Sequence, residues 1–181
     1  MSASCWPRIW MPAKHMPEMP VPTTSPARTR LLVIGYGNTL RGDDSLGPRL
    51  VAKLEPMNLP GLTTLECGLL TPEVADPVSN ADVVIFADAA VDAPREVQFR
   101  ELEPAETSQI MAHAANPRTI LALARDVFGH APTGWWLTIP AESLGFTEEI
   151  TASAQAGLDQ AVQLILEFHQ KQLAGSPGQA G

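Results

Sequence analysis

The sequence predicts an α/β domain built as a three-layer α/β/α sandwich, with helices on both faces of a mostly parallel, twisted sheet. Short apolar stretches rich in β-branched residues alternate with amphipathic helical patterns along the chain. The stretch 83–87 (VVIFA) has no polar interruption, as expected for a parallel strand buried on both faces. The stretch 97–102 alternates instead, which indicates an edge strand that we expect to run antiparallel.

The first strand is expected at 31–35, where the sequence reads LLVIG. A glycine-rich turn follows, and then a helix over 46–54 whose apolar face is formed by Leu46, Leu50, Val51 and Leu54. A second strand is expected at 62–67 (LTTLEC). A short helix begins after Thr71-Pro72, because proline is favoured in the first turn of a helix.

The elements after the edge strand follow the same alternation. The stretch PRTILALARDV predicts a helix over 117–127, and WWLTI predicts a strand at 135–139. The longest amphipathic pattern, 151–170, predicts a final helix whose inner side carries Ala154, Leu158, Val162, Ile165 and Phe168.

The chain has 181 residues, of which 45% are apolar, and this length and composition fit one domain with one core. We place the domain at 30–171. Residues 1–29 are rich in proline, which indicates a disordered tail or a start codon assigned too early. Residues 172–181 are expected to form a flexible C-terminal tail. Two cysteines, Cys5 and Cys67, make no disulfide framework.

The composition also excludes several classes of partner. A formal net charge of -8 argues against nucleic acid, whose binding rests on neutralising phosphates. No apolar run approaches the roughly 20 residues of a membrane-spanning helix, and no secretory signal is visible. We therefore expect a cytoplasmic protein with neither membrane nor nucleic acid as a partner.

Polar groups that can do chemistry follow the predicted strands. Asp43 and Asp44 follow the first strand, Asp88 follows 83–87, and His113 precedes the helix over 117–127. Since the carboxyl ends of parallel strands meet at one edge of a sheet, we expect these side chains to converge. Carboxylate and imidazole donors suit a borderline divalent metal, and they can also serve as acid–base groups.

Each of these residues also has a structural interpretation. Asp43 is expected to cap the helix that begins there, whereas capping and function are equally open for Asp44. Asp88 needs a partner if it is half-buried, but it can also cap a loop. His113 is either a loop-packing side chain or a ligand. We expect no role in chemistry for His15, His130, His169, Trp135, Trp136 and Cys67.

The glycine-rich turn does not match a dinucleotide-binding fingerprint. Gly35 and Gly37 fit G-x-G-x-x-G, but the third glycine position is Leu40. Two acids then stand where a pyrophosphate would lie, so the ligand expected at this turn is a cation.

The block GYGNTLRGDDSLG at 35–47, the strand ending in Ala87-Asp88-Ala89, and His113 with its following LALA helix resemble the nickel–iron hydrogenase maturation proteases. The resemblance spans 31–168. It implies an aspartic-type endopeptidase that removes a C-terminal peptide from the hydrogenase large-subunit precursor after nickel insertion, which activates the hydrogenase. It also implies that Asp44, Asp88 and His113 are both the catalytic and the nickel-recognising residues, with no metal cofactor of the enzyme's own. The nickel would be supplied by the precursor.

Three departures from the family pattern concern subfamily and partner. The first-loop acid, often Glu in the family, is Asp44 here; Ser45 replaces a frequent Gly; and the sequence HAAN after Ala112 is a variant form. Gly37 and Asn38 are expected to let the backbone approach the substrate closely.

The same residues leave two other functions open. One is a nickel-sensing chaperone or adaptor that docks without cutting, for which the same three residues would serve. The other is a peptidyl-tRNA hydrolase, whose opening also runs from a strand into G-x-G-N. This chain lacks the later basic and His-Asn stretch of those enzymes, and its acidic charge disfavours tRNA.

Overall fold

The computed structural model describes residues 29–91, 95–106 and 116–175. Within this part of the chain, five strands form one sheet in the order β2-β1-β3-β5-β4. The strands are β1 (Leu31–Tyr36), β2 (Leu62–Cys67), β3 (Val83–Ala90), β4 (Gln98–Leu102) and β5 (Thr133–Pro140). All neighbours are parallel except β4 and β5, so the predicted antiparallel edge strand is confirmed.

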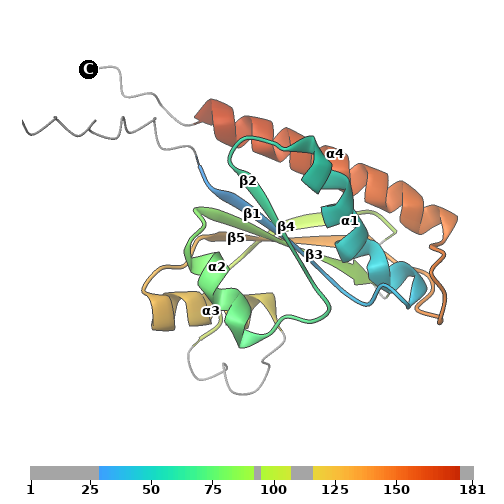
Figure 1. The fold of residues 1–181 in the computed structure, drawn as a ribbon, viewed down its shortest axis with the longest axis horizontal. Helices are drawn as coiled ribbons and strands as arrows, with labels where there is room; N and C mark the ends of the chain where they lie inside the picture. The colour runs from blue at the N-terminus through green and yellow to red at the C-terminus, as the bar shows by residue number, and fades with distance from the viewer. Residues whose placement is uncertain (1–28, 92–94, 107–115, 176–181) are drawn as a thin grey trace, which may run out of the picture.

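Helices cover both faces of this sheet. They are α1 (Leu46–Leu54), α2 (Ala75–Ser79), α3 (Pro117–Phe128) and α4 (Ala152–Gly175), with short 3-10 turns η1 (Gly42–Ser45), η2 (Glu55–Met57) and η3 (Pro72–Val74). Figure 1 shows α1 and α4 on one face and α2 and α3 on the other. The predicted three-layer α/β class is therefore confirmed.

The core lies in two layers, one on each side of the central strands. On β3, Ile85 and Ala87 pack in the layer beneath α1 and α4, whereas Val84 and Phe86 pack in the layer beneath α2 and α3. All four are fully buried, which explains why the stretch carries no polar residue before Asp88.

Five elements extend beyond their predicted bounds, β1 and α3 by one residue each and β3, β5 and α4 by more. β3 runs on to Ala90, so Asp88 lies within the strand rather than after it, and this part of the prediction is wrong. The reason is the neighbouring strand, since β5 pairs with β3 as far as Ala90 and Pro140 and itself begins at Thr133. α4 continues to Gly175, past the predicted domain end at 171, because good helix formers fill that segment.

The aromatic residues of the longest helix and the sheet edge form one cluster. Trp135 stacks on Phe99 with ring centroids 4.7 Å apart, and Phe168 contacts Trp135 edge-on at 5.2 Å. This agrees with the core role expected for Trp135. Among the described residues, no helix combines the length and the apolar character needed to cross a bilayer.

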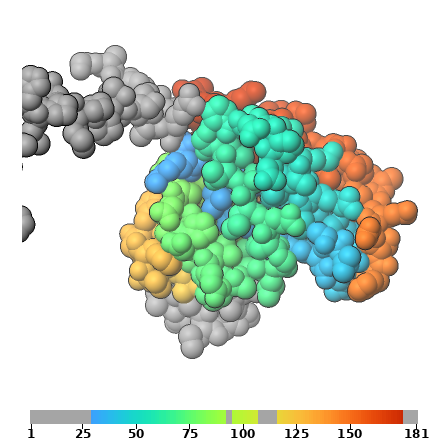
Figure 2. Space-filling model, viewed as in Figure 1, coloured from blue at the N-terminus to red at the C-terminus, as the bar shows by residue number. Residues whose placement is uncertain are grey.

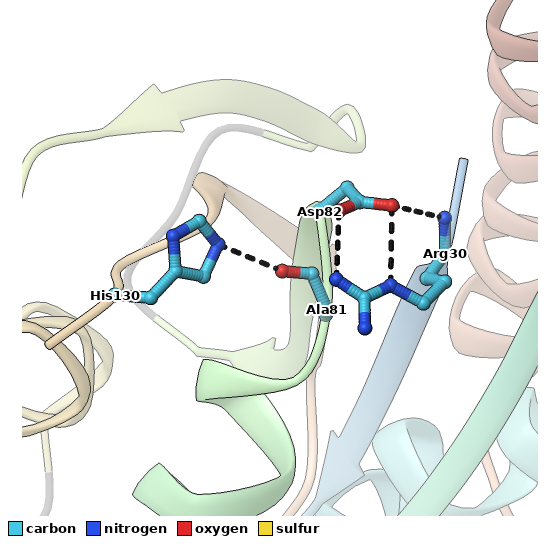
Figure 3. A network of polar contacts seen from close by, with 4 residues as sticks. All are labelled: Arg30, Ala81, Asp82 and His130. Atoms are coloured by element: carbon cyan, nitrogen blue, oxygen red, sulfur yellow. Dashed lines mark hydrogen bonds and ion pairs between the residues drawn. The ribbon is translucent and has the colours of Figure 1, made fainter. Parts of the chain in front are cut away.

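The amino edge of the sheet is held by a polar network that Figure 3 displays. The Arg30 guanidinium and backbone N–H both bind Asp82, at 3.0 Å and 2.7 Å, and the Arg30 hydrogen bond lowers the pKa of that carboxyl. His130 Nε2 lies 3.1 Å from the Ala81 carbonyl oxygen. These contacts join the starts of β1 and β3 and so help to fix the register in which the two strands pair.

Candidate active site

The turn after β1 is drawn tightly against the sheet by two glycines. A Cβ on Gly47 would lie 2.4 Å from the Tyr36 carbonyl oxygen and 2.7 Å from that of Ala87, and a Cβ on Gly35 would lie 2.0 Å from the Gly47 oxygen. Gly47 therefore provides the close helix–strand packing that a third fingerprint glycine provides in dinucleotide sites. This contact brings the start of α1, and the acids before it, over the ends of β1 and β3.

Asp44 is oriented by the glycine-rich loop. Gly37 has φ +140°, and a Cβ there would lie 2.0 Å from the Asp44 carbonyl oxygen. The Asn38 backbone N–H donates to Asp44 Oδ2 at 3.2 Å. In the structure, the backbone of Gly37 and Asn38 closely approaches Asp44. Asp44 is half-buried, and the Asn38 N–H holds its carboxylate in place.

Asp43 has a different role from the capping role expected for it. Neither η1 nor α1 has a side-chain cap, so the capping interpretation is wrong. The fully buried Asp43 carboxylate instead accepts hydrogen bonds from the backbone of Glu142 at 2.8 Å, Ser143 at 3.1 Å and Thr151 at 2.7 Å, and from Thr151 Oγ1 at 2.9 Å. Burial alone would raise the pKa of Asp43, but these four donors together lower it.

The segment 142–151 is therefore fastened to the acid-bearing turn. The Gly42 N–H donates to the Thr147 carbonyl at 2.6 Å, and the Arg49 guanidinium donates to the Glu148 carbonyl. In Figure 2 the light-blue segment after β1 lies directly against the orange segment before α4. Ser45 is buried and bridges the Gly42 carbonyl (2.6 Å) and Arg49 Nε (2.7 Å).

Asp88 projects from β3 into the same region. It is half-buried, accepts a hydrogen bond from the Tyr36 hydroxyl, and accepts another from the Ala89 N–H at 2.8 Å. Burial, followed by the nearby charge of Asp44, raises the pKa of Asp88 to about 6 against the opposing effect of the two hydrogen bonds. The fold thus brings Asp44 and Asp88 within electrostatic reach of each other, as the convergence of strand ends requires.

Tyr36 is a site residue that the sequence analysis missed. It is 9% exposed, and burial together with the Asp88 charge raises the pKa of its hydroxyl, which therefore remains a proton donor. The Trp136 indole nitrogen lies near the Tyr36 oxygen but has no hydrogen-bond partner of good geometry. A signal was present in the sequence, because alternation places Tyr36 and Asp88 on the same face of adjacent strands.

The third predicted ligand, His113, lies outside the described residues. Within the described ranges, no group of three His, Cys, Asp or Glu side chains is placed to hold a metal ion. Cys67 ends β2 opposite Tyr36 in register, half-buried, and burial raises the pKa of its thiol. In the described part of this edge, the carboxylates of Asp44 and Asp88 are the side chains available to bind a cation.

No protein-family model matches this chain, and no curated protein matches it in sequence. Solved structures do match. The hydrogenase-maturating endopeptidase HybD from E. coli is 24% identical, with a TM-score of 0.63 over 79% of this chain and 93% of that one. The NiFe hydrogenase maturation protease HycI from Thermococcus kodakarensis is 22% identical, with a TM-score of 0.63 over 78% and 93%.

A third match is the hydrogenase 2 maturation peptidase of a Thaumarchaeota archaeon. It is 27% identical, with a TM-score of 0.58 over 77% of this chain and 97% of that one. Each comparison covers almost the whole of the solved chain, so the likeness concerns the complete domain rather than a shared substructure. The chain therefore has the fold of the hydrogenase maturation endopeptidases, and the predicted resemblance to the nickel–iron hydrogenase maturation proteases is confirmed.

Proposed function

We propose that this protein is an endopeptidase that removes the C-terminal peptide of a nickel-containing hydrogenase large-subunit precursor. The observation that carries the proposal is the convergence of Asp44 and Asp88 at the carboxyl edge of a sheet with this fold. Ligands of open α/β sheets bind at that edge.

The two carboxylates suit recognition of a metal ion carried by the substrate. Asp44 and Asp88 repel each other, and the approach of a divalent cation removes that repulsion and favours the ionised form of Asp88. Oxygen donors together with an imidazole suit nickel. On this proposal the nickel belongs to the precursor, and its binding at Asp44, Asp88 and His113 aligns the bond to be cut.

We assign that role to His113 from the sequence resemblance. It stands three residues before Asn116, whose side chain accepts from the Arg118 N–H at 2.9 Å and caps α3. Asn116 and Trp136 line one cavity of about 490 Å³, and Trp136 neighbours Tyr36.

The chemistry proposed is hydrolysis by a positioned water molecule. One of the two carboxylates accepts a proton from the water as its oxygen attacks the carbonyl carbon of the peptide bond. The carboxyl group then gives this proton to the amide nitrogen, which leaves as an amine as the C–N bond breaks. Substrate nickel polarises the carbonyl oxygen. The hydrogen bond from Tyr36 holds the Asp88 side chain in place, whichever of the two carboxylates acts as the base.

The test is to incubate the purified protein with the nickel-loaded precursor and measure the mass of the precursor. We expect a shorter product with the wild-type chain, and none with Asp88→Asn or with nickel-free precursor. A stable complex without any loss of mass would identify a nickel-sensing adaptor instead. Stoichiometric nickel retained by the purified protein after dialysis would contradict a substrate-borne metal.

A further inference from the structure

Two exposed apolar residues lie on neighbouring backbone segments beside the loop that carries Asp44. Phe146 is 86% exposed and Leu40 is 48% exposed. An isolated parallel bridge joins Arg41 to Thr147, the residues that directly follow Leu40 and Phe146, so the backbones of Leu40 and Phe146 approach each other at that bridge. Leu40 belongs to the loop that orients Asp44, which makes this surface continuous with the proposed active site.

Arg41 adds a cation to the same surface. Its Nε donates to the Leu144 carbonyl at 3.4 Å, and within the described residues it forms no ion pair. Aromatic and arginine side chains are the types that carry most binding energy in protein interfaces. We name the surface formed by Leu40, Arg41 and Phe146 the rim patch.

The rim patch is held rigidly although it is exposed. Asp43 binds the backbone on both sides of Phe146, at Glu142, Ser143 and Thr151. The Gly42 N–H binds the Thr147 carbonyl directly beside it. Because the segment is already ordered, a partner that covers Phe146 does not have to order it, and this lowers the cost of binding.

We infer that the rim patch binds the precursor protein beside the scissile peptide. The face of the precursor that binds there presents an apolar side chain next to a carboxylate. This inference rests on the proposed function. The carboxylate would pair with Arg41, and the apolar group would cover Leu40 and Phe146. A second copy of this chain is the less suitable occupant, because two chains of net charge -8 repel each other.

The test compares cleavage kinetics of the nickel-loaded precursor by the full chain and its variants. Phe146→Ser is expected to raise KM about tenfold, and Leu40→Ser and Arg41→Ala several-fold, with kcat within about twofold of wild type. The matched controls are Phe128→Ser and Val127→Ser, which alter side chains 47% and 67% exposed at the end of α3. These controls are expected to leave both constants unchanged.

Unchanged KM in the rim-patch variants would overturn the inference, as would an equal rise in the controls. A wild-type dimer that Phe146→Ser dissociates in sedimentation would also overturn it, because the patch would then bind a second copy. If the wild-type chain does not cut the precursor, the proposed protease function fails, and equilibrium binding decides the docking question separately. Weaker binding by the rim-patch variants alone supports docking, and equal binding or no wild-type binding overturns it.

Discussion

The Tyr36 hydroxyl donates a hydrogen bond to the Asp88 carboxylate across two adjacent parallel strands. This contact opposes burial and the charge of Asp44, both of which favour the protonated form of Asp88. The protonation state of Asp88 at neutral pH is therefore set by its burial, by the hydrogen bonds from Tyr36 and the Ala89 N–H, and by the charge of Asp44.

Removing that hydroxyl should raise the pKa of Asp88 above its value of about 6. Tyr36→Phe keeps the ring and its packing, so we expect a loss of about 1 kcal/mol of stability and no change of fold. The carboxyl resonance of Asp88, followed by NMR titration, measures the shift. An unchanged titration midpoint in the variant would show that the hydrogen bond does not influence Asp88.

The raised pKa of Asp88 also predicts how stability depends on pH. The folded chain keeps this proton up to about pH 6, whereas the unfolded chain releases it near pH 3.9. The contribution of Asp88 to the free energy of unfolding therefore falls as the pH rises from about 4 to about 6. Asp88→Asn removes the effect and should stabilise the protein at pH 7 by on the order of 2 kcal/mol. Urea unfolding of both proteins from pH 4 to pH 7.5 gives the difference, which should vanish towards pH 4.

The buried carboxylate of Asp43 should be essential for stability. Asp43→Asn places an amide N–H₂ group among four hydrogen-bond donors, and we expect a loss of about 3 kcal/mol. A helix cap alone would cost about 1 kcal/mol. The matched control is Asp76→Asn on the exposed surface of α2, which should cost only a few tenths of a kcal/mol. Thermal and urea unfolding distinguish the two roles.

The contact between α1 and the sheet should tolerate no side chain at Gly47. Gly47→Ala brings a Cβ within 2.4–2.7 Å of three backbone atoms of Tyr36 and Ala87, so α1 must move, at a cost of about 2–3 kcal/mol. Gly68→Ala is the control, because nothing lies within 4 Å of its Cβ. Equal unfolding midpoints for the two variants would contradict the close packing described for Gly47.

Much of the fold was predictable from local pattern. The bounds of β2 and α1 match the predicted 62–67 and 46–54, because turn residues bracket short periodic stretches there. The end of β3 was not predictable in this way. Its last residues pair with β5, and such pairing is a property of a strand about 50 residues away in the sequence rather than of Asp88 and Ala89 themselves.

The sequence by itself determined the order of the elements, the α/β class, and the placement of Asp44 and Asp88 towards the carboxyl ends of neighbouring strands. Periodicity is a local property and the edge rule for parallel sheets is a topological one, so neither needs the tertiary structure. The tertiary structure alone decided what each acid does. Asp43 is bound by donors about 100 residues further along the chain, and Asp88 is paired with a tyrosine on another strand. Such contacts form between a turn and a distant loop, or across a sheet, where no sequence period specifies which polar groups meet.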